Sequence, residues 1–304
     1  MNYLTNYEGW LHLNKREKTA QTYLGEVRMF AEWWEGLYGK SFTPSEVIAL
    51  DTSEYKQYLM NVAKGKQGKR LSMITVNKKI EALRNYFTFL VQEEKSIPKN
   101  PIEHIKTQRI HAATMAEPRW LDRNEKNRFL RTIETIGEKK SKQKIRNKAI
   151  CYLMLKAGLR VSEVVSLRFD DIELERGLLT VQDGKGGKMR RVTINKEVVI
   201  AIQDWLEIRG EQPTDVIFVS QKRTPLTVQG VEDFFKKIKV EANIEELTPH
   251  VLRHTFCHDL IEKGHSISLV ADMAGHSDLN TTRLYTRSSQ DERRKAAESL
   301  SANS

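Results

Sequence analysis

The chain has 304 residues, enough for about two domains of ordinary size. Hydrophobic residues make up 39% of it and aromatic residues 8%, a content of core-forming residues that excludes a chain disordered throughout. Its two cysteines, Cys151 and Cys257, are too few for a disulfide framework or a cysteine-based zinc site. No run approaches the roughly 20 apolar residues of a membrane span, and the N-terminus has no signal-peptide pattern, so we expect a cytoplasmic protein.

The charge of the chain points to a polyanionic partner. Fifty Lys and Arg residues against 40 Asp and Glu residues give a formal net charge of +10 at pH 7. Residues 1–116 and 117–304 each carry half of this excess. Nucleic acid is therefore the first candidate partner, although charge alone does not distinguish this chain from basic proteins that bind no DNA.

Residues 1–98 predict an all-helical first domain. Apolar residues recur at helical spacing in three segments, 18–37, 52–63 and 75–92. Between the last two, AKGKQGKRLS carries three candidate DNA-binding cations, Lys66, Lys69 and Arg70. This segment is equally consistent with a solvated loop and with a phosphate-contacting turn, because Ser72 or Thr75 could begin the next helix and leave backbone N–H groups facing an anion.

A linker and a second domain follow. Segment 96–118 loses the helical periodicity and contains three of the seven prolines, and we place the linker at 99–118. Residues 119–304 show both the helical spacing and the strand-like alternation of apolar residues. They predict a hairpin of GLLTVQD and MRRVTI around the turn GKGGK, and a short strand at 216–220. The predicted helices are 123–136, 143–158, 196–209, 228–241, 249–263 and 266–274. The predicted fold class is mainly α with a small β-sheet.

Three histidines, His250, His254 and His258, fall four residues apart in PHVLRHTFCHDL and could surround a metal ion on one helical face. The metalloprotease pattern fails, because it needs a glutamate where Val251 stands. His254 and His258 also suit the edge of a hydrophobic core. His250 and Arg253 lie one helical turn apart, and an imidazole beside a guanidinium suits a phosphate better than a metal ion.

Further cations stand at junctions between predicted elements. Arg160 follows Gly158, where one helix is expected to end and the next to begin, and it suits either an ion pair with Glu163 or a functional role. In DGKGGKMRR, a tight glycine turn presents Lys185 and Lys188 on a hairpin tip that could enter a groove of DNA.

A last segment, GHSDLNTTRLYT, places His276 directly after a glycine and Tyr285 nine residues later. Asn280 or Thr281 could cap a short helix between them. A lone tyrosine is ordinarily a core residue, so this segment is informative only together with the others.

Four of these motifs occur in a recognisable order: AGLRVSEVVSL, GKGGKMRR, TPHVLRHTF and AGHSDLNTTRLYT. Their wording and spacing resemble the tyrosine recombinases, the lambda-integrase family, and most closely its Xer-type and transposon-encoded members. The resemblance covers about residues 119–290. The helical block before the linker is similar to the family's N-terminal core-binding (SAM-like) domain in size and character only.

The resemblance implies a catalytic set and a fold. It makes Tyr285 the nucleophile that forms an O-(3′-phospho-DNA)-tyrosine link, and the remaining catalytic positions fall on Arg160, Lys185, His250, Arg253 and His276. Lys185 would be the general acid, with Lys188 as its rival, and His250 the base for Tyr285. The two domains would close on DNA as a C-shaped clamp. No metal ion, cofactor or ATP is implied, because the transesterification conserves the phosphodiester bond energy.

The resemblance also implies partners. The substrate would be a duplex DNA recombination site bound by a homotetramer, a dimer per site, with exchange through a Holliday junction. Whether a second recombinase or accessory factor takes part is left open, and no membrane partner is expected. Residues 287–304 would dock on a neighbouring protomer, unless they form a frayed tail. Lys66, Lys69, Arg70, Lys188 and Arg190 are weaker candidates for contacts with DNA. The biological role would be DNA integration, excision, transposition or dimer resolution. Two alternatives stay open, type IB topoisomerase-like relaxation and a DNA-binding accessory protein that does not cleave.

Overall fold

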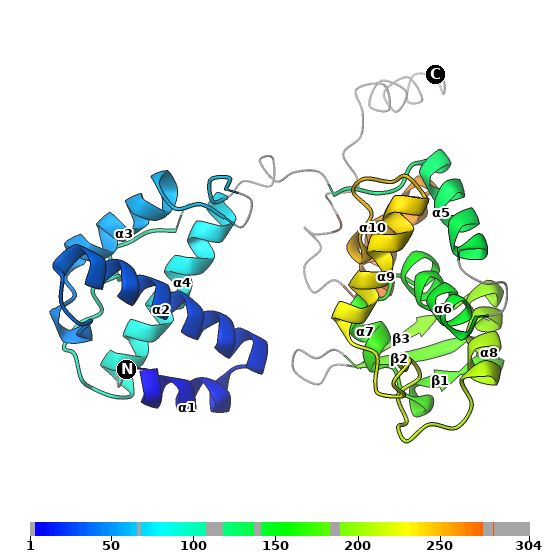
Figure 1. The fold of residues 1–304 in the computed structure, drawn as a ribbon, viewed down its shortest axis with the longest axis horizontal. Helices are drawn as coiled ribbons and strands as arrows, with labels where there is room; N and C mark the ends of the chain where they lie inside the picture. The colour runs from blue at the N-terminus through cyan, green and yellow to red at the C-terminus, as the bar shows by residue number, and fades with distance from the viewer. Residues whose placement is uncertain are drawn as a thin grey trace, which may run out of the picture. The chain divides into compact units, whose positions relative to one another are not determined.

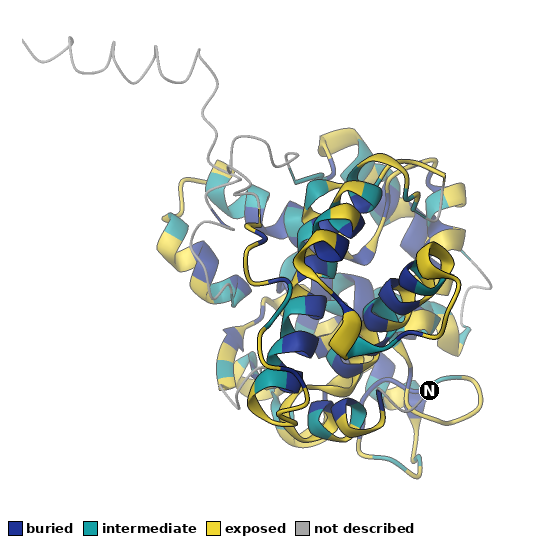
Figure 2. Cartoon of the chain, turned by 90° about the vertical axis from the view of Figure 1, so that its left-hand side faces the viewer, coloured by how far each residue is buried: buried dark blue, intermediate teal, exposed yellow. Residues whose placement is uncertain are grey.

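The computed structural model describes residues 4–65, 68–107, 118–136, 141–182, 189–275 and 282. The chain divides into two compact units, Met1–Met115 and Ala116–Ser304 (Figure 1). Along the helices of each unit, buried residues alternate with exposed ones, so that most helices have a buried and an exposed face (Figure 2). No helix among the described residues is both long enough and apolar enough to span a membrane.

The described part of the first unit is helical. It contains α1 (Thr5–Asn14), α2 (Glu17–Tyr38), the 3-10 turn Pro44–Glu46, α3 (Ala49–Asn61) and α4 (Met73–Gln92). Gly39 ends α2 in a left-handed conformation, with φ of 65°. Ser72 begins α4, because its hydroxyl accepts the backbone N–H of Thr75. The three helices predicted from periodicity are confirmed to within three residues at each end.

Aromatic side chains and one buried carboxylate hold the first unit together. Phe30 of α2 meets the rings of Tyr55 and Phe87 edge to face. Asp51, only 1% exposed, accepts hydrogen bonds from the indole of Trp34 and the hydroxyl of Tyr38, which anchors α3 to α2. These contacts pack α2, α3 and α4 against one another.

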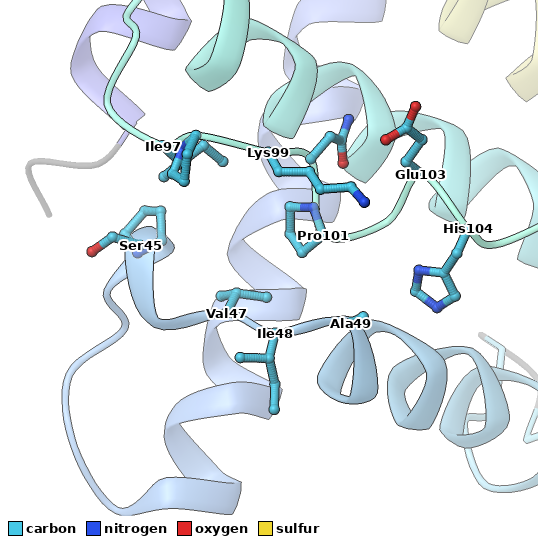
Figure 3. Close-up of a pocket in the computed structure, with 12 residues that line it drawn as sticks. Ser45, Val47, Ile48, Ala49, Ile97, Lys99, Pro101, Glu103 and His104 are labelled. Carbon is cyan, nitrogen blue, oxygen red and sulfur yellow. The ribbon is translucent and has the colours of Figure 1, made fainter.

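The predicted linker begins too early. Ile102 and Ile105, which fall within the predicted linker 99–118, are buried in the core of the first unit. Residues from the segments 97–104 and 44–49 line a cavity of about 650 Å³ (Figure 3). The ring of His104, on its lining, lies 2.9 Å from the hydroxyl of Ser53 on α3. The prolines interrupt the helical period without releasing the chain, because the isoleucines between them pack on α3 and α4.

The second unit contains seven helices and a small sheet in the ranges described. The helices are α5 (Arg123–Thr135), α6 (Lys142–Lys156), α7 (Val161–Ser166), α8 (Lys196–Arg209), α9 (Val228–Glu241), α10 (Pro249–Glu262) and α11 (Ile267–Ala274). The strands are β1 (Ile172–Glu173), β2 (Leu178–Gln182) and β3 (Met189–Thr193), antiparallel in the order β1-β2-β3, with Leu179 opposite Val192. Helix α6 is central and packs against α8 and α10 (Figure 1). The predicted fold class, mainly α with a small β-sheet, is confirmed.

The strand predicted at 216–220 is not formed. Val216 and Val219 make only isolated bridges, to Arg168 and Pro225. The run is buried and apolar, but its backbone is satisfied by mixed partners: Arg209 donates to the carbonyl groups of Val216 and Ile217, and the carbonyl of Phe218 accepts the backbone N–H of Leu226. An apolar run of this length predicts burial, and it does not determine how the backbone is satisfied.

Candidate active site

A sharp turn after α6 brings the first predicted arginine to the site. Gly158 adopts a left-handed conformation with φ of 68°. A Cβ atom there would lie 2.4 Å from the ring of Phe256 on α10, so only glycine permits both the turn and the close approach. The chain then enters α7, and Arg160 is the residue before its first turn.

Arg253 ties this turn to the end of α11. Its side chain, 4% exposed, donates hydrogen bonds to the carbonyl groups of Gly158 and Ala274, the latter at 2.5 Å. Burial, reinforced by repulsion from Arg160, lowers the pKa of Arg253 to about 10. An anion bound beside these two guanidinium groups would relieve the repulsion.

Arg160 joins α7 to the same end of α11 and remains partly exposed. Its guanidinium donates to the carboxylate of Glu163 at 2.7 Å and to the carbonyl of Gly275 at 2.8 Å. The side chain keeps 33% of its surface exposed. The predicted ion pair with Glu163 is therefore confirmed, and the partly exposed guanidinium keeps room for a further partner.

Glu163 is the buried carboxylate at the centre of the cluster. Besides the side chain of Arg160 it accepts the backbone N–H of Arg160 at 2.8 Å, and both terminal nitrogens of Arg190 bind it at 2.9 Å. Burial alone would raise the pKa of Glu163, but the hydrogen bonds from Arg190 and Arg160 hold it below its usual value. Two arginines thus bind one ionised carboxylate, and with Arg253 nearby the cluster is positively charged.

His250 and His254 stand on α10 beside this cluster and are predominantly neutral at pH 7. Partial desolvation, together with the charges of Arg253 and Arg160, lowers the pKa of His250 although its side chain is exposed. Burial and the neighbouring His250 lower the pKa of His254 to about 4. A neutral imidazole can accept a proton, so His250 has the charge state that a general base requires.

The three-histidine metal group is not brought together. His258 stacks on Trp120, with ring centroids 4.2 Å apart, away from His250 and His254. Within the described ranges, metal-ligand geometry occurs at His258, Asp259 and Glu262, and Asp259 is already paired with Lys126 at 2.7 Å. His250 instead lies beside the charges of Arg253 and Arg160.

One residue predicted to contact DNA has a protein partner in the structure, and several other predicted residues lie outside the described ranges. Arg190, proposed as a weaker DNA contact, is bound to Glu163 and is 15% exposed. Lys69 and Arg70 are exposed on the first unit. The predicted residues that lie outside the described residues are Lys66, Lys185, Lys188, His276, Asn280, Thr281 and Tyr285, with the segment 287–304.

Sequence reasoning missed the roles of Gly275 and Arg190. Gly275 ends α11 with φ of 65°, and its carbonyl is the acceptor for Arg160. The sequence shows the glycine before His276, but it cannot show that the carbonyl of Gly275 accepts from Arg160, because the two residues are 115 positions apart. The period-2 alternation of β3 could have indicated that Arg190 and Arg191 face opposite sides of the strand.

Comparisons with known proteins agree with the motifs. Residues 119–292 match the phage integrase family. The chain is 35% identical to the TnP I resolvase of Bacillus thuringiensis, over 91% of this chain and 92% of that protein. It is 31% identical to the tyrosine recombinase XerA of Thermococcus kodakarensis, over 97% of this chain and 94% of that protein. The structure of the XerH site-specific recombinase bound to its difH substrate is similar, with a TM-score of 0.71, 25% identity, and coverage of 91% of this chain and 78% of that chain.

Proposed function

The chain belongs to the phage integrase family and is a tyrosine recombinase, and from this premise we propose that it exchanges DNA strands through a covalent 3′-phosphotyrosyl intermediate formed by Tyr285. The observation that carries the proposal is the meeting of Arg160 and Arg253 on the turn at Gly158 and the end of α11. Two guanidinium groups held there are suited to the nonbridging oxygens of one phosphodiester.

The two arginines act where charge develops. A phosphodiester is a monoanion and gains negative charge in the pentavalent transition state, so fixed cations stabilise that state more than the ground state. Backbone carbonyls hold Arg253 in place, and no reorganisation is needed as the charge appears. Neutral His250 accepts the phenolic proton of Tyr285, which then attacks phosphorus.

The leaving 5′ oxygen needs a proton. We assign that proton to Lys185 and a hydrogen bond to a nonbridging oxygen to His276, on the strength of their positions in the family motifs. Attack breaks the bond between phosphorus and the 5′ oxygen and forms the bond to Tyr285. Attack by a 5′-hydroxyl of another strand reverses these steps and releases the tyrosine.

We assign DNA binding to both units, the first as a core-binding domain that reaches past residue 98 to Ile105 and residues 119–304 as the catalytic domain, closed on duplex DNA as a clamp. The net charge of +10 supports this assignment. Lys66, Lys69 and Arg70 would contact phosphates from the loop that precedes α4. Lys188 would contact DNA beside Lys185.

We also propose that exchange occurs in a DNA-bound tetramer, a dimer at each site, through a Holliday junction, with the segment 287–304 docked on a neighbouring protomer. The biological role is integration or excision of a mobile element, or dimer resolution, with or without a second recombinase or accessory factor. The names of the relatives, a resolvase and a Xer recombinase, favour strand exchange over topoisomerase-like relaxation and over a non-cleaving accessory role.

A trapping assay tests the proposal. A labelled duplex from the DNA flanking the gene carries a nick just downstream of the cleaved phosphate, so that cleavage releases a short strand and leaves the protein attached. Wild-type protein should give a protein-linked band on a denaturing gel. Tyr285→Phe should give none and should bind the same DNA within about a few-fold, because affinity rests on many phosphate contacts. Binding by the wild type without any linked band would favour the accessory role.

A further inference from the structure

Arg190 is the third arginine of the cluster, and its contacts differ from those of Arg160 and Arg253. It lies on β3, opposite Val181 of β2, and points inward while the neighbouring Arg191 is exposed. Both of its terminal nitrogens bind Glu163, one to each carboxylate oxygen, at 2.9 Å. This two-bond geometry fixes the carboxylate plane as well as its position.

Arg190 also packs against the turn that ends α11. A Cβ atom on Gly275 would lie 2.6 Å from Nε of Arg190, so the guanidinium rests directly on the glycine backbone. Nε itself is buried without a hydrogen-bond partner in the part of the chain that the structure describes. Arg190 therefore touches both groups that hold the side chain of Arg160, the carboxylate of Glu163 and the backbone of Gly275.

The contact between Arg190 and Glu163 affects the charge that Arg160 can offer to a phosphate. If Arg160 alone were paired with Glu163, the carboxylate would cancel much of the charge that Arg160 offers to a phosphate. Arg190 shares the same carboxylate through two hydrogen bonds, so the cluster of three arginines and one carboxylate keeps a net positive charge. The arrangement keeps the guanidinium of Arg160 oriented and its charge available.

We propose that Arg190 is a positioning residue, which holds Glu163 and the Gly275 turn so that Arg160 can stabilise the charge on the scissile phosphate. The proposal rests on the proposed function of Arg160 and assigns Arg190 no contact with DNA. Its location on β3, directly after residues 183–188, means that the outgoing strand of the hairpin is fastened to the same carboxylate as Arg160.

A substrate whose scissile phosphate carries no negative charge distinguishes a positioning role of Arg190 from a purely structural one. Single-turnover cleavage is measured on two nicked duplexes, one with the normal scissile phosphate and one with a methylphosphonate, which has no net charge. The variants are Arg190→Met, Arg190→Lys and Arg160→Met, and Arg191→Met is the matched control on the exposed face of the same strand. Thermal unfolding of each variant shows whether the fold is retained.

Arg190→Met should slow cleavage of the normal substrate about 10- to 100-fold, the usual effect of losing hydrogen bonds to a charged group. On the methylphosphonate the same variant should stay within about threefold of wild type, because a neutral phosphorus centre needs less stabilisation by a cation. Arg190→Lys, which retains the charge and one bond to Glu163, should fall between these limits. Arg191→Met should match wild type on both substrates.

Two different failures can be told apart. An equal loss on both substrates for Arg190→Met and Arg190→Lys, or no loss on either, overturns the positioning role while Arg160→Met still shows the charge-dependent loss. If Arg160→Met itself loses nothing, or loses equally on both substrates, the proposed role of Arg160 is wrong.

Discussion

Gly158 is the position where a single methyl group should do the most damage to the site. In Gly158→Ala the residue would have to adopt a left-handed conformation with φ of 68°, at a cost of about 1–2 kcal/mol. The new Cβ would also lie 2.4 Å and 2.5 Å from two ring carbons of buried Phe256, and overpacking of this kind costs about 1–3 kcal/mol. The free energy of unfolding of the second unit should fall by about 2–5 kcal/mol.

Gly264, just after the end of α10, offers a matched control. Gly264 has φ of 84°, but nothing lies within 4 Å of the Cβ that Gly264→Ala would add. That variant should lose only the conformational part, about 1–2 kcal/mol. Urea unfolding of the full chain, followed by circular dichroism, measures both. DNA cleavage by Gly158→Ala should fall as well, because the carbonyl of Gly158 is an acceptor for Arg253.

The double variant Gly158→Ala/Phe256→Leu separates the clash from other effects. A smaller side chain at 256 removes the ring that the methyl group meets, so the double variant should lose less stability than the two single variants added together. Equal losses for Gly158→Ala and Gly264→Ala, or full additivity in the double variant, would refute the close contact between Gly158 and Phe256.

Three further predictions concern the proton chemistry of the site. Lys185→Ala should be rescued by a 5′-bridging phosphorothiolate, whose sulfur leaves without a proton; rescue of Lys188→Ala instead would make Lys188 the general acid. Arg160→Met should raise the pKa of His250, measured by NMR of the imidazole, because it removes a cation that now lowers it; an unchanged pKa would contradict this electrostatic link. His254 has a pKa of about 4 in the folded chain, against an ordinary value of 6.5, so the unfolded chain binds the proton at a higher pH. The free energy of unfolding should therefore fall by up to about 3 kcal/mol as the pH falls from 6.5 to 4. His254→Gln should reduce this slope in urea titrations at several pH values, and an unchanged slope would contradict the pKa shift.

Much of the fold follows from local signals in the sequence. The helices 18–37 and 196–209 show a clear apolar period and end at glycine, and the structure has them as Glu17–Tyr38 and Lys196–Arg209. The hairpin follows from two alternating runs around a glycine turn, and β2 and β3 have the predicted places. These features depend on neighbours along the chain, which is why a single sequence predicts them.

The rest depends on contacts between distant segments. Ile102 and Ile105 look like part of a linker until their burial against α3 and α4 is known. The strand predicted at 216–220 is replaced by backbone groups that bond to Arg209, which no local pattern of that segment indicates. In the candidate site, the motif residues Arg160 and Arg253 are predictable, whereas the support of Arg160 by Arg190 and Gly275 requires three segments to meet.

The identity of the residue that becomes linked to DNA tests the central claim most directly. The trapped protein–DNA adduct is digested with a protease and a nuclease, and mass spectrometry locates the residue that carries the remaining 3′ nucleotide. The proposed mechanism predicts that the nucleotide is on Tyr285, and that Arg160→Met and Arg253→Met lower the yield of this peptide. A nucleotide on any other residue, or an undiminished yield in both arginine variants, would contradict the claim that this arginine cluster activates Tyr285.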